Sequence, residues 1–269
     1  MNTILITVIV SFLVALILGL LLGFFKKMFS VPVDEKVAKV REVLPGANCG
    51  GCGYPGCDGF AAAVAAGEAS ADGCAAGGAE TAKKVGEVMG LAVEAESKVV
   101  ILACRGSKDA AKARGFYNGL KNCAAAHLAV NGTKMCQYGC IGFGDCVNAC
   151  QFDALHLEED GLPHVDYTKC TGCGMCVQAC PMHLLSKVPV SRKGAVALCS
   201  NHTDNKPSVL KNCKVGCIKC GKCERNCPEK CLKLVNGIPE IDYAKCTSCG
   251  TCIEGCPTHV LKLVQNVIA

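Results

Sequence analysis

Apolar positions dominate the first part of the chain. Residues Ile4 to Phe25 contain no charged side chain, and a helix of this length reaches about 33 Å, enough for a hydrocarbon core of about 30 Å. Lys26 and Lys27 follow directly. The positive-inside rule therefore predicts a single-pass anchor in the plasma membrane, with the amino terminus outside and the rest of the chain in the cytoplasm. A cleaved signal peptide is the alternative, but the segment lacks a basic start and an A-x-A-like cleavage site.

Two shorter segments have the apolar spacing of an amphipathic helix. Residues 34–44 and 79–92 are predicted to be helices, and residues 93–97 a linker. Between the helices lies a stretch rich in Cys, Gly and Ala that ends at Cys74. We therefore expect a small domain around a single site. The predicted inward positions are Val37, Val40, Val43 and Leu44 in the first helix and Ala82, Val85, Val88 and Met89 in the second.

Beyond residue 98 the chain repeats itself. The segment DGLPHVDYTKCTGCGMCVQACPMHLL (160–185) matches NGIPEIDYAKCTSCGTCIEGCPTHVL (236–261) without a gap, and CQYGCIGFGDCVNAC (136–150) matches CKVGCIKCGKCERNC (213–227). The DG and NG pairs predict tight hairpins between short strands. Residues 99–103 and 195–198 also predict short buried strands, each with a cysteine just after it. Such self-similarity predicts a duplicated structural unit.

These patterns together predict an α+β protein with one transmembrane helix and a duplicated ferredoxin-like region with short hairpins. The expected divisions are an anchor at 1–29, a single-cluster domain at 30–92, a first repeat at 93–190 and a second repeat at 191–269. Within the repeats, the ferredoxin-like modules are expected at about 134–188 and 213–265.

The cysteine content gives the strongest indication of chemistry. The chain has 25 cysteines in 269 residues and no Trp. Disulfides are one interpretation of such a content, but a reducing cytoplasm disfavours them, and the tight clustering of the thiols favours metal ligation. The net charge of +5 comes without a basic run with interleaved aromatics, so nothing predicts nucleic-acid binding.

The pattern C-x2-C-x2-C-x3-C-P occurs three times in the second half of the chain. It starts at Cys170, Cys217 and Cys246. This is the run of bacterial two-cluster ferredoxins, in which the first three cysteines hold one [4Fe-4S] cluster and the fourth holds its neighbour. Zinc is the alternative, but zinc sites usually pair two C-x2–4-C arms.

Carrying this crossover through the sequence gives four ligand sets. Three are regular, whereas the fourth has irregular spacing: Phe143 stands where the later copy has Cys220, and Gln151 replaces the proline. The regular sets are Cys170, Cys173, Cys176 with Cys150; Cys217, Cys220, Cys223 with Cys256; and Cys246, Cys249, Cys252 with Cys227. The irregular set is Cys136, Cys140, Cys146 with Cys180.

Two further cysteine groups remain. Cys49, Cys52, Cys57 and Cys74 lie at a Gly-rich bend and are predicted to hold one more [4Fe-4S] cluster. Cys104, Cys123, Cys199 and Cys213 occur as two matching pairs in the duplication. We predict that this group holds a sixth cluster, with buried core thiols as the alternative. Cys231 is predicted to be a buried thiol. The cofactors expected are therefore at least five [4Fe-4S] clusters.

No acid–base pair or nucleophile–His–acid set stands out, so the chain shows no substrate-transforming site of its own. The single amino-terminal helix, NCGGCGYPGC with Cys74, and the tandem Cys-Pro runs together resemble the B-subunit (RnfB) family of Rnf complexes, in its longer form with two ferredoxin-like modules.

The resemblance implies the iron–sulfur electron-transfer subunit of a membrane-bound ferredoxin:NAD+ oxidoreductase that moves Na+ or H+. The implied partners are reduced ferredoxin and the other membrane, flavin-binding and NAD-binding subunits. The remaining alternatives are a membrane-anchored polyferredoxin that feeds another oxidoreductase complex, a subunit of a different energy-converting complex, and a zinc scaffold without redox activity.

Overall fold

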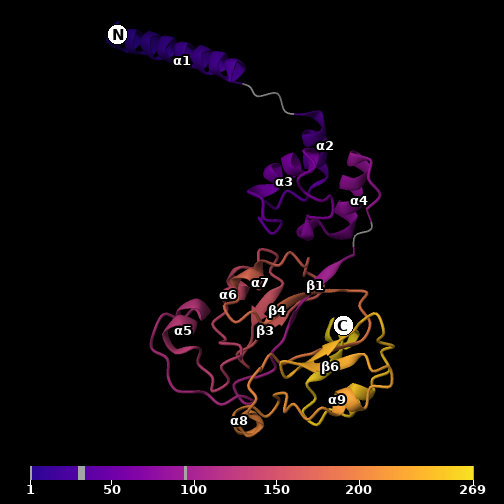
Figure 1. Cartoon of the computed structure of the whole chain (residues 1–269). Helices are drawn as coiled ribbons and strands as arrows, with labels where there is room; N and C mark the ends of the chain where they lie inside the picture. The colour runs from indigo at the N-terminus through magenta and orange to yellow at the C-terminus, as the bar shows by residue number, and fades with distance from the viewer. Residues whose placement is uncertain (1, 30–33, 94–95, 269) are drawn as a thin grey trace.

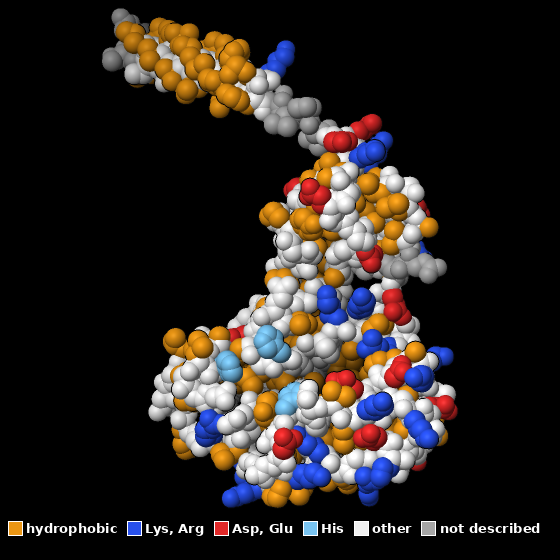
Figure 2. All heavy atoms as spheres, in the orientation of Figure 1, with side chains coloured by type: hydrophobic (Ala, Val, Ile, Leu, Met, Phe, Trp, Pro, Cys, Tyr) orange, Lys and Arg blue, Asp and Glu red, His pale blue; other side chains and the backbone are white. Residues whose placement is uncertain are grey.

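The first helix stands apart from the rest of the molecule (Figure 1). The computed structural model describes residues 2–29, 34–93 and 96–268. Helix α1 (Asn2–Met28) ends with Lys26 and Lys27 in its last turn. Its apolar side chains are exposed along its length, as Figure 2 shows in orange. Among the described residues, Ile4–Met28 is the one helical stretch long and apolar enough to cross a membrane.

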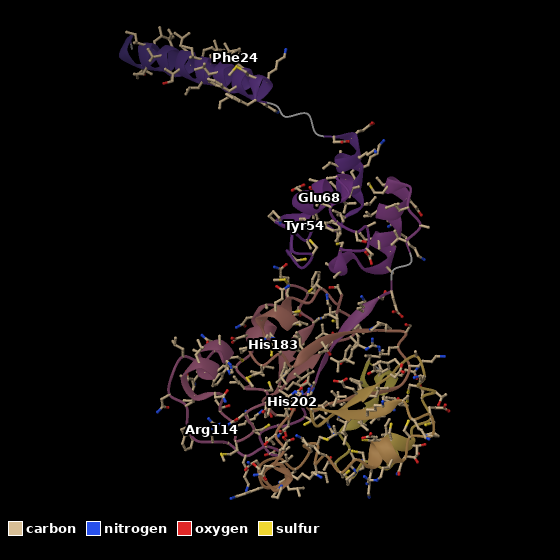
Figure 3. The ribbon with its side chains drawn as sticks, viewed as in Figure 1. Phe24, Tyr54, Glu68, Arg114, His183 and His202 are labelled. Carbon is tan, nitrogen blue, oxygen red and sulfur yellow. The ribbon has the colours of Figure 1, made fainter. Side chains whose placement is uncertain are left out.

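Three helices form the amino-terminal domain that follows: α2 (Glu35–Val43), α3 (Gly56–Ala65) and α4 (Gly78–Met89), with a 3-10 turn, η1 (Ala75–Gly77), before α4. The side chain of Asp34 caps the start of α2 by accepting from the amide of Lys36. Val40, Phe60 and Val85 bring one residue from each helix into a common buried core. Figure 3 places Tyr54, whose ring lies against Phe60, in this domain.

The predicted helices at 34–44 and 79–92 therefore correspond to α2 and α4, and α4 ends earlier because Gly90 adopts a left-handed conformation. Helix α3 has no counterpart in the sequence prediction. The predicted domain boundary after residue 29 adjoins residues 30–33, and the predicted linker at 93–97 includes residues 94–95. Both of these ranges lie outside the described residues.

Two repeats with the same strand pairing make up the region after residue 96. In each repeat the first strand pairs antiparallel with the last, and the two middle strands form a hairpin. In the first repeat, β1 (Lys98–Leu102) pairs with β4 (Leu185–Pro189), and β2 (Leu155–Leu157) pairs with β3 (Pro163–Val165). In the second, β5 (Ala195–Ala197) pairs with β8 (Leu261–Leu263), and β6 (Leu232–Val235) pairs with β7 (Ile238–Ile241).

Short helices connect these strands. Those of the first repeat are α5 (Cys123–Val130), α6 (Asp145–Asn148) and α7 (Met175–Ala179). Those of the second are α8 (Lys206–Asn212), α9 (Lys222–Arg225), α10 (Thr251–Glu254) and α11 (Val264–Ile268). The hairpin between β6 and β7 turns at Asn236 and Gly237, which both have positive φ (48° and 76°), as a two-residue type I′ turn requires.

The two repeats pack against each other through apolar side chains. Ile101 and Val188 of the first repeat share a buried cluster with Leu198 and Val264 of the second. Just beyond β1 and β5, Cys104 and Cys199 face each other in an isolated antiparallel bridge. The ends of the two equivalent strands therefore meet at the junction of the repeats.

The amino-terminal domain touches the first repeat at a cysteine-bearing loop. A Cβ atom placed on Gly51 would lie 3.1 Å from the carbonyl oxygen of Cys173 and 3.6 Å from the Sγ of Cys49. Glycine at this position therefore permits a close approach of two cysteine-rich loops.

Candidate functional site

The four cysteines of the amino-terminal domain lie together on one side of its core. Cys57 sits in the first turn of α3, where its amide donates to the side chain of Asn48 over 2.8 Å. Cys74 precedes η1, and burial raises the pKa of its thiol, with the neighbouring thiols adding to the effect. The neighbours are Cys52, Cys57 and Cys49. The set predicted from the Gly-rich bend is thus brought together.

Cysteine-lined cavities of similar size occur at four places in the duplicated region. Four or five thiols line each one. The cysteines are Cys104, Cys136, Cys199 and Cys213 in the first cavity; Cys123, Cys140, Cys146 and Cys180 in the second; Cys217, Cys220, Cys223 and Cys256 in the third; and Cys227, Cys231, Cys246, Cys249 and Cys252 in the fourth.

The structure brings together all three regular sets that the Cys-Pro runs predict. Two of them line the third and fourth cavities. The remaining regular set gathers around Cys176, close to the thiols of Cys170, Cys173 and Cys150. In the fourth cavity Cys231 joins the predicted four, with its Sγ 3.4 Å from that of Cys227.

The two other predicted sets are not brought together, because Cys123 and Cys136 exchange places. Cys136 lies in the first cavity, and Cys123 lies in the second beside Cys140. Helix α5 begins at Cys123 and packs this residue against Ile141 and Phe143. The thiol of Cys123 thus lines the cavity of the repeat in which Phe143 replaces the cysteine of the later copy.

A signal for this exchange is present in the sequence. The overlay of residues 136–150 on 213–227 makes Cys136 the counterpart of Cys213. The shorter likeness of GLKNC (119–123) to VLKNC (209–213) points instead to Cys123, which lines a different cavity from Cys213. The longer overlay is the better guide, because it places Cys136 and Cys213 at equivalent positions around one cavity.

Adjacent cysteine sets approach one another closely. Cys146 and Cys176 share a buried apolar cluster with Val100 and Leu185, so the second cavity adjoins the set around Cys176. In the second repeat, Cys223 occupies a similar cluster with Cys227 and Cys252. Each module therefore presents two neighbouring thiol sets separated by aliphatic side chains.

Burial favours the protonated form of three thiols in the first repeat. It raises the pKa of Cys140 and of Cys146 to about 12, and that of Cys176 to about 12. Because iron and zinc bind the thiolate, occupation of these sites releases protons. Cys249 differs, since it is exposed and the hydroxyl of Thr251, which donates to its sulfur, lowers its pKa.

The spacing of the thiols suits a multi-iron cluster. In the described part of the chain, no three His, Cys, Asp or Glu side chains converge tightly enough to hold a single metal ion. A zinc ion requires its sulfurs at about 2.3 Å from one point. Four thiols that line a common space can instead each bind a different iron of a [4Fe-4S] cluster.

Three protein-family models match the chain. The model for an Fe-S cluster covers residues 44–76, the model for a 4Fe-4S binding domain covers residues 163–185, and the model for a 4Fe-4S dicluster domain covers residues 216–260. Together they include the amino-terminal cysteine set and the three Cys-Pro runs. The chain therefore carries iron–sulfur domains of the 4Fe-4S ferredoxin type.

Curated relatives match most of the chain. The B subunit of the Na+-translocating ferredoxin:NAD+ oxidoreductase complex from Acetobacterium woodii is 42% identical over 220 residues, which are 81% of this chain and 66% of that protein. The B subunit of the ion-translocating oxidoreductase complex from Methanosarcina acetivorans is 38% identical over 81% of this chain and 83% of its own length.

A third relative comes from Clostridium ljungdahlii. It is the B subunit of a proton-translocating ferredoxin:NAD+ oxidoreductase complex, and it is 39% identical over 90% of this chain and 85% of its own length. The three relatives share the subunit designation although the coupling ions in their names differ. The extent of the matches, together with the three iron–sulfur domains and the amino-terminal apolar helix, shows that the chain belongs to the B-subunit family of Rnf-type ion-translocating oxidoreductase complexes.

Proposed function

We propose that the chain relays single electrons from reduced ferredoxin to partner subunits of an Rnf-type complex that couples this transfer to Na+ or H+ movement. The observation that carries the proposal is the closeness of neighbouring cysteine sets. In the first repeat Cys146 and Cys176 share a buried cluster, and in the second Cys223 packs with Cys227 and Cys252. The amino-terminal domain approaches Cys173 at Gly51.

Five ligand sets follow from the positions of the thiols. A [4Fe-4S] cluster accepts and releases one electron at a time, and the protein sets its potential through burial and hydrogen bonds to sulfur. The proposed sets are Cys49, Cys52, Cys57, Cys74; Cys123, Cys140, Cys146, Cys180; Cys150, Cys170, Cys173, Cys176; Cys217, Cys220, Cys223, Cys256; and Cys227, Cys246, Cys249, Cys252.

The second repeat is the proposed docking surface for ferredoxin. Residues 191–269 contain twelve Lys and Arg but six Asp and Glu, and Figure 2 shows many of these basic side chains, in blue, on the lower part of the molecule. A basic surface attracts an acidic electron carrier and speeds its encounter. Cys249 is exposed on this repeat, so its set lies where a partner can approach.

The amino-terminal domain is the proposed output side. It lies between α1 and the first repeat (Figure 1), so its cysteine set is carried by the domain that follows the membrane helix directly. Lys26 and Lys27 in the last turn of α1 favour a cytoplasmic location for everything that follows them. Electrons that arrive at the second repeat would thus leave near the membrane.

Anaerobic purification of the full chain tests this function. We expect a brown protein with iron and sulfide in equal amounts, whose visible absorption bleaches with dithionite and also with reduced ferredoxin. The rate with ferredoxin should fall as salt is added, because screening weakens attraction between exposed charges. A colourless protein that binds zinc, or a coloured one that reduced ferredoxin cannot bleach at any salt concentration, would contradict the proposal.

A further inference from the structure

Hydroxyl groups accompany the thiols of the fourth cavity. Ser248 lines this cavity from the loop between Cys246 and Cys249. Its hydroxyl oxygen is buried, and among the described residues it has no hydrogen-bond partner. Buried hydroxyls are nearly always hydrogen-bonded, so this geometry suits a cavity whose occupant accepts a hydrogen bond. The sulfur atoms of a [4Fe-4S] cluster are such acceptors.

A second hydroxyl contacts a thiol of the same cavity directly. Thr251 begins α10, and its Oγ1 donates to the Sγ of Cys249 over 3.4 Å. Both Thr251 and Cys249 are exposed, so this hydrogen bond lies where solvent reaches the thiol set. Ser248 and Thr251 therefore place one buried and one exposed hydroxyl beside the same four predicted ligands.

The equivalent loop of the first repeat lacks both hydroxyls. In the overlay of residues 160–185 on 236–261, Gly172 stands where the second repeat has Ser248, and Met175 stands where it has Thr251. The threonine that follows the first cysteine of each run is present in both repeats, so it does not distinguish them. The two equivalent thiol sets thus differ in the hydrogen-bond donors around them.

The backbone explains why the first repeat carries no side chain at this position. Gly172 and Ser248 both have positive φ, 66° and 60° respectively, a conformation that favours glycine. A Cβ atom on Gly172 would clash with the carbonyl oxygen of Lys98 at the start of β1, so the first repeat requires glycine here. In the second repeat glycine would also fit the conformation without cost, and the hydroxyl is the feature that serine adds.

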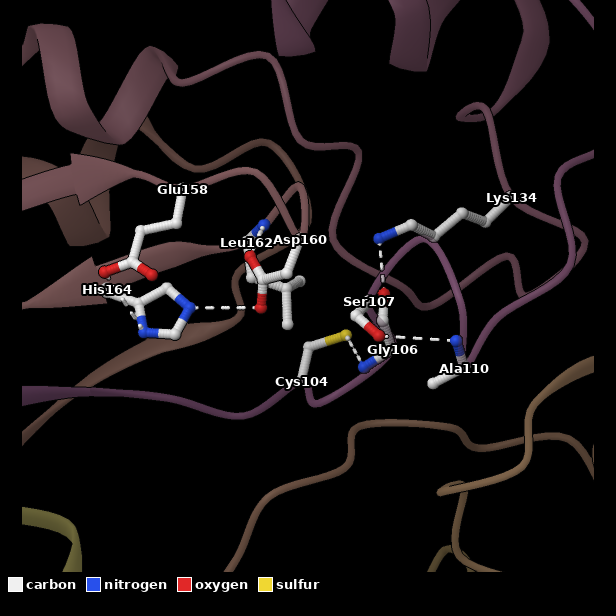
Figure 4. Close-up of polar contacts among 9 residues, drawn as sticks. All are labelled: Cys104, Gly106, Ser107, Ala110, Lys134, Glu158, Asp160, Leu162 and His164. Carbon is white, nitrogen blue, oxygen red and sulfur yellow. Dashed lines mark hydrogen bonds and ion pairs between the residues drawn. The ribbon is translucent and has the colours of Figure 1, made fainter.

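Backbone donors to sulfur occur in both repeats. The amide of Gly106 donates to the Sγ of Cys104 over 3.4 Å in the first repeat (Figure 4). The amide of Cys217 donates to the Sγ of Cys199 over 3.4 Å in the second. Because amide donors serve both halves, the side-chain hydroxyls are what sets the fourth cavity apart.

Hydrogen bonds to sulfur change the potential of a cluster in a known direction. Reduction adds one negative charge, so a donor to sulfur stabilises the reduced state more than the oxidised state. Exposure to solvent acts in the same direction. Cys249 is exposed, whereas Cys173, its counterpart in the first repeat, is buried. Both effects therefore favour reduction at the fourth cavity.

We propose that Ser248 and Thr251 raise the reduction potential of the [4Fe-4S] cluster in the fourth cavity above that of its counterpart around Cys176. This inference rests on the proposed electron-transfer function and adds an order of potentials to it. An electron delivered to the second repeat is held there more firmly than at the counterpart site, so its passage to the first repeat is the uphill step. Ser248 and Thr251 act through sulfur, and neither binds iron.

An anaerobic potentiometric titration of the full chain tests the proposal. Cys252→Ala should lose about four irons, and subtracting its titration from that of the unaltered chain gives the curve of the fourth-cavity cluster. Cys176→Ala gives the curve of the counterpart in the same way. The fourth-cavity cluster should have the higher midpoint, and a lower one would overturn the proposal.

Substitution of the two hydroxyls then identifies the cause. Ser248→Ala and Ser248→Gly should keep every iron and shift this one midpoint to lower potential, by about tenfold in the reduction equilibrium or about 59 mV for one electron. Equal shifts in the two variants identify the hydroxyl, since alanine and glycine differ in backbone freedom. Thr251→Val should lower the same midpoint, whereas Thr251→Ser keeps the hydroxyl and should not.

Ser186→Ala is the control, because this hydroxyl is exposed on β4, and it should leave every midpoint unaltered. An unaltered fourth-cavity midpoint in either Ser248→Ala or Thr251→Val would overturn the inference. A chain that reduced ferredoxin still bleaches would leave the proposed function intact in that case, whereas a colourless chain would contradict the function itself.

Discussion

Asp145 holds Cys123 and the start of α5 in place. Its carboxylate accepts from the amide of Cys123 over 2.7 Å and from the amide of Ala124 over 3.0 Å. Asn122 binds the amide of Ala125 over 2.7 Å, so the first three free amides of α5 are all satisfied by side chains. In return, the amide of Asp145 lies against the sulfur of Cys123. Replacing Asp145 should therefore loosen this cysteine specifically.

The expected cost follows from these two hydrogen bonds. Each contributes about 1 kcal/mol net to stability, so Asp145→Ala should destabilise the start of α5 by about 2 kcal/mol. This corresponds to a change of about thirtyfold in the local opening equilibrium. Because loss of iron from the second cavity requires this opening, the cluster with Cys123 should be released about thirtyfold faster. Asp145→Asn keeps one acceptor oxygen, so its rate of iron release should lie between those of Asp145→Ala and the unaltered chain.

A chelator challenge measures this effect. The protein is incubated anaerobically with an excess of an iron chelator, and the release of iron is followed as a function of time. Asp145→Ala should release about four irons in a separate fast phase, whereas a change at the exposed Asp109 should leave the time course unaltered. A time course for Asp145→Ala that matches the unaltered chain would refute the argument that this carboxylate holds Cys123 in place.

Three further outcomes can be checked independently. Cys227→Ala should retain its irons, because the Sγ of Cys231 lies 3.4 Å from that of Cys227 and lines the same cavity. The double variant that lacks both thiols should lose about four irons. An equal loss in the single variant would contradict the idea that Cys231 can substitute for Cys227. Gly51→Val should slow reduction of the amino-terminal domain in stopped-flow measurements, because even a Cβ atom there would lie 3.1 Å from the Cys173 carbonyl oxygen. The control is the same change at Gly115, where a Cβ meets nothing within 4 Å. Equal rates in the two variants would argue against electron transfer across the contact at Gly51. Removing residues 1–29 should release a soluble protein that keeps its irons, as fractionation and iron analysis would show, whereas continued attachment to vesicles would contradict the role of α1 as the anchor.

Features set by short, local sequence signals could be predicted. The uncharged run from Ile4 to Phe25 exceeds the length at which hydrophobicity alone indicates a spanning helix, and α1 covers it. The three Cys-Pro runs each place four cysteines within a short segment, and the crossover rule predicts groups whose members the structure also brings together. Asn236 and Gly237 predict a tight hairpin because both accept positive φ, and β6 and β7 meet there.

Features set by tertiary packing could not be predicted from the sequence. Helix α3 starts with Gly56 and contains Gly59, both poor helix formers, and it is held by burial of Phe60 and Val64 in the domain core. Helix α5 has no clear amphipathic spacing, because small and apolar residues occur all round it. Since the sequence pattern does not predict this helix, it gives no reason to place Cys123 beside Phe143, although the overlay of residues 136–150 on 213–227 does pair Cys136 with Cys213.

The pairing of thiols at the junction of the repeats also bears on how the chain arose. A pocket to which two equivalent halves contribute the same two residues has the form of a cofactor site across the twofold axis of a homodimer. One repeat alone supplies only Cys104 and Cys136, or only Cys199 and Cys213, and so half of the wall. An ancestral protein with a single repeat would have completed this wall by pairing with a second copy of itself. Fusion of the two copies would then have freed each half to diverge, as at Phe143, where the second repeat has Cys220.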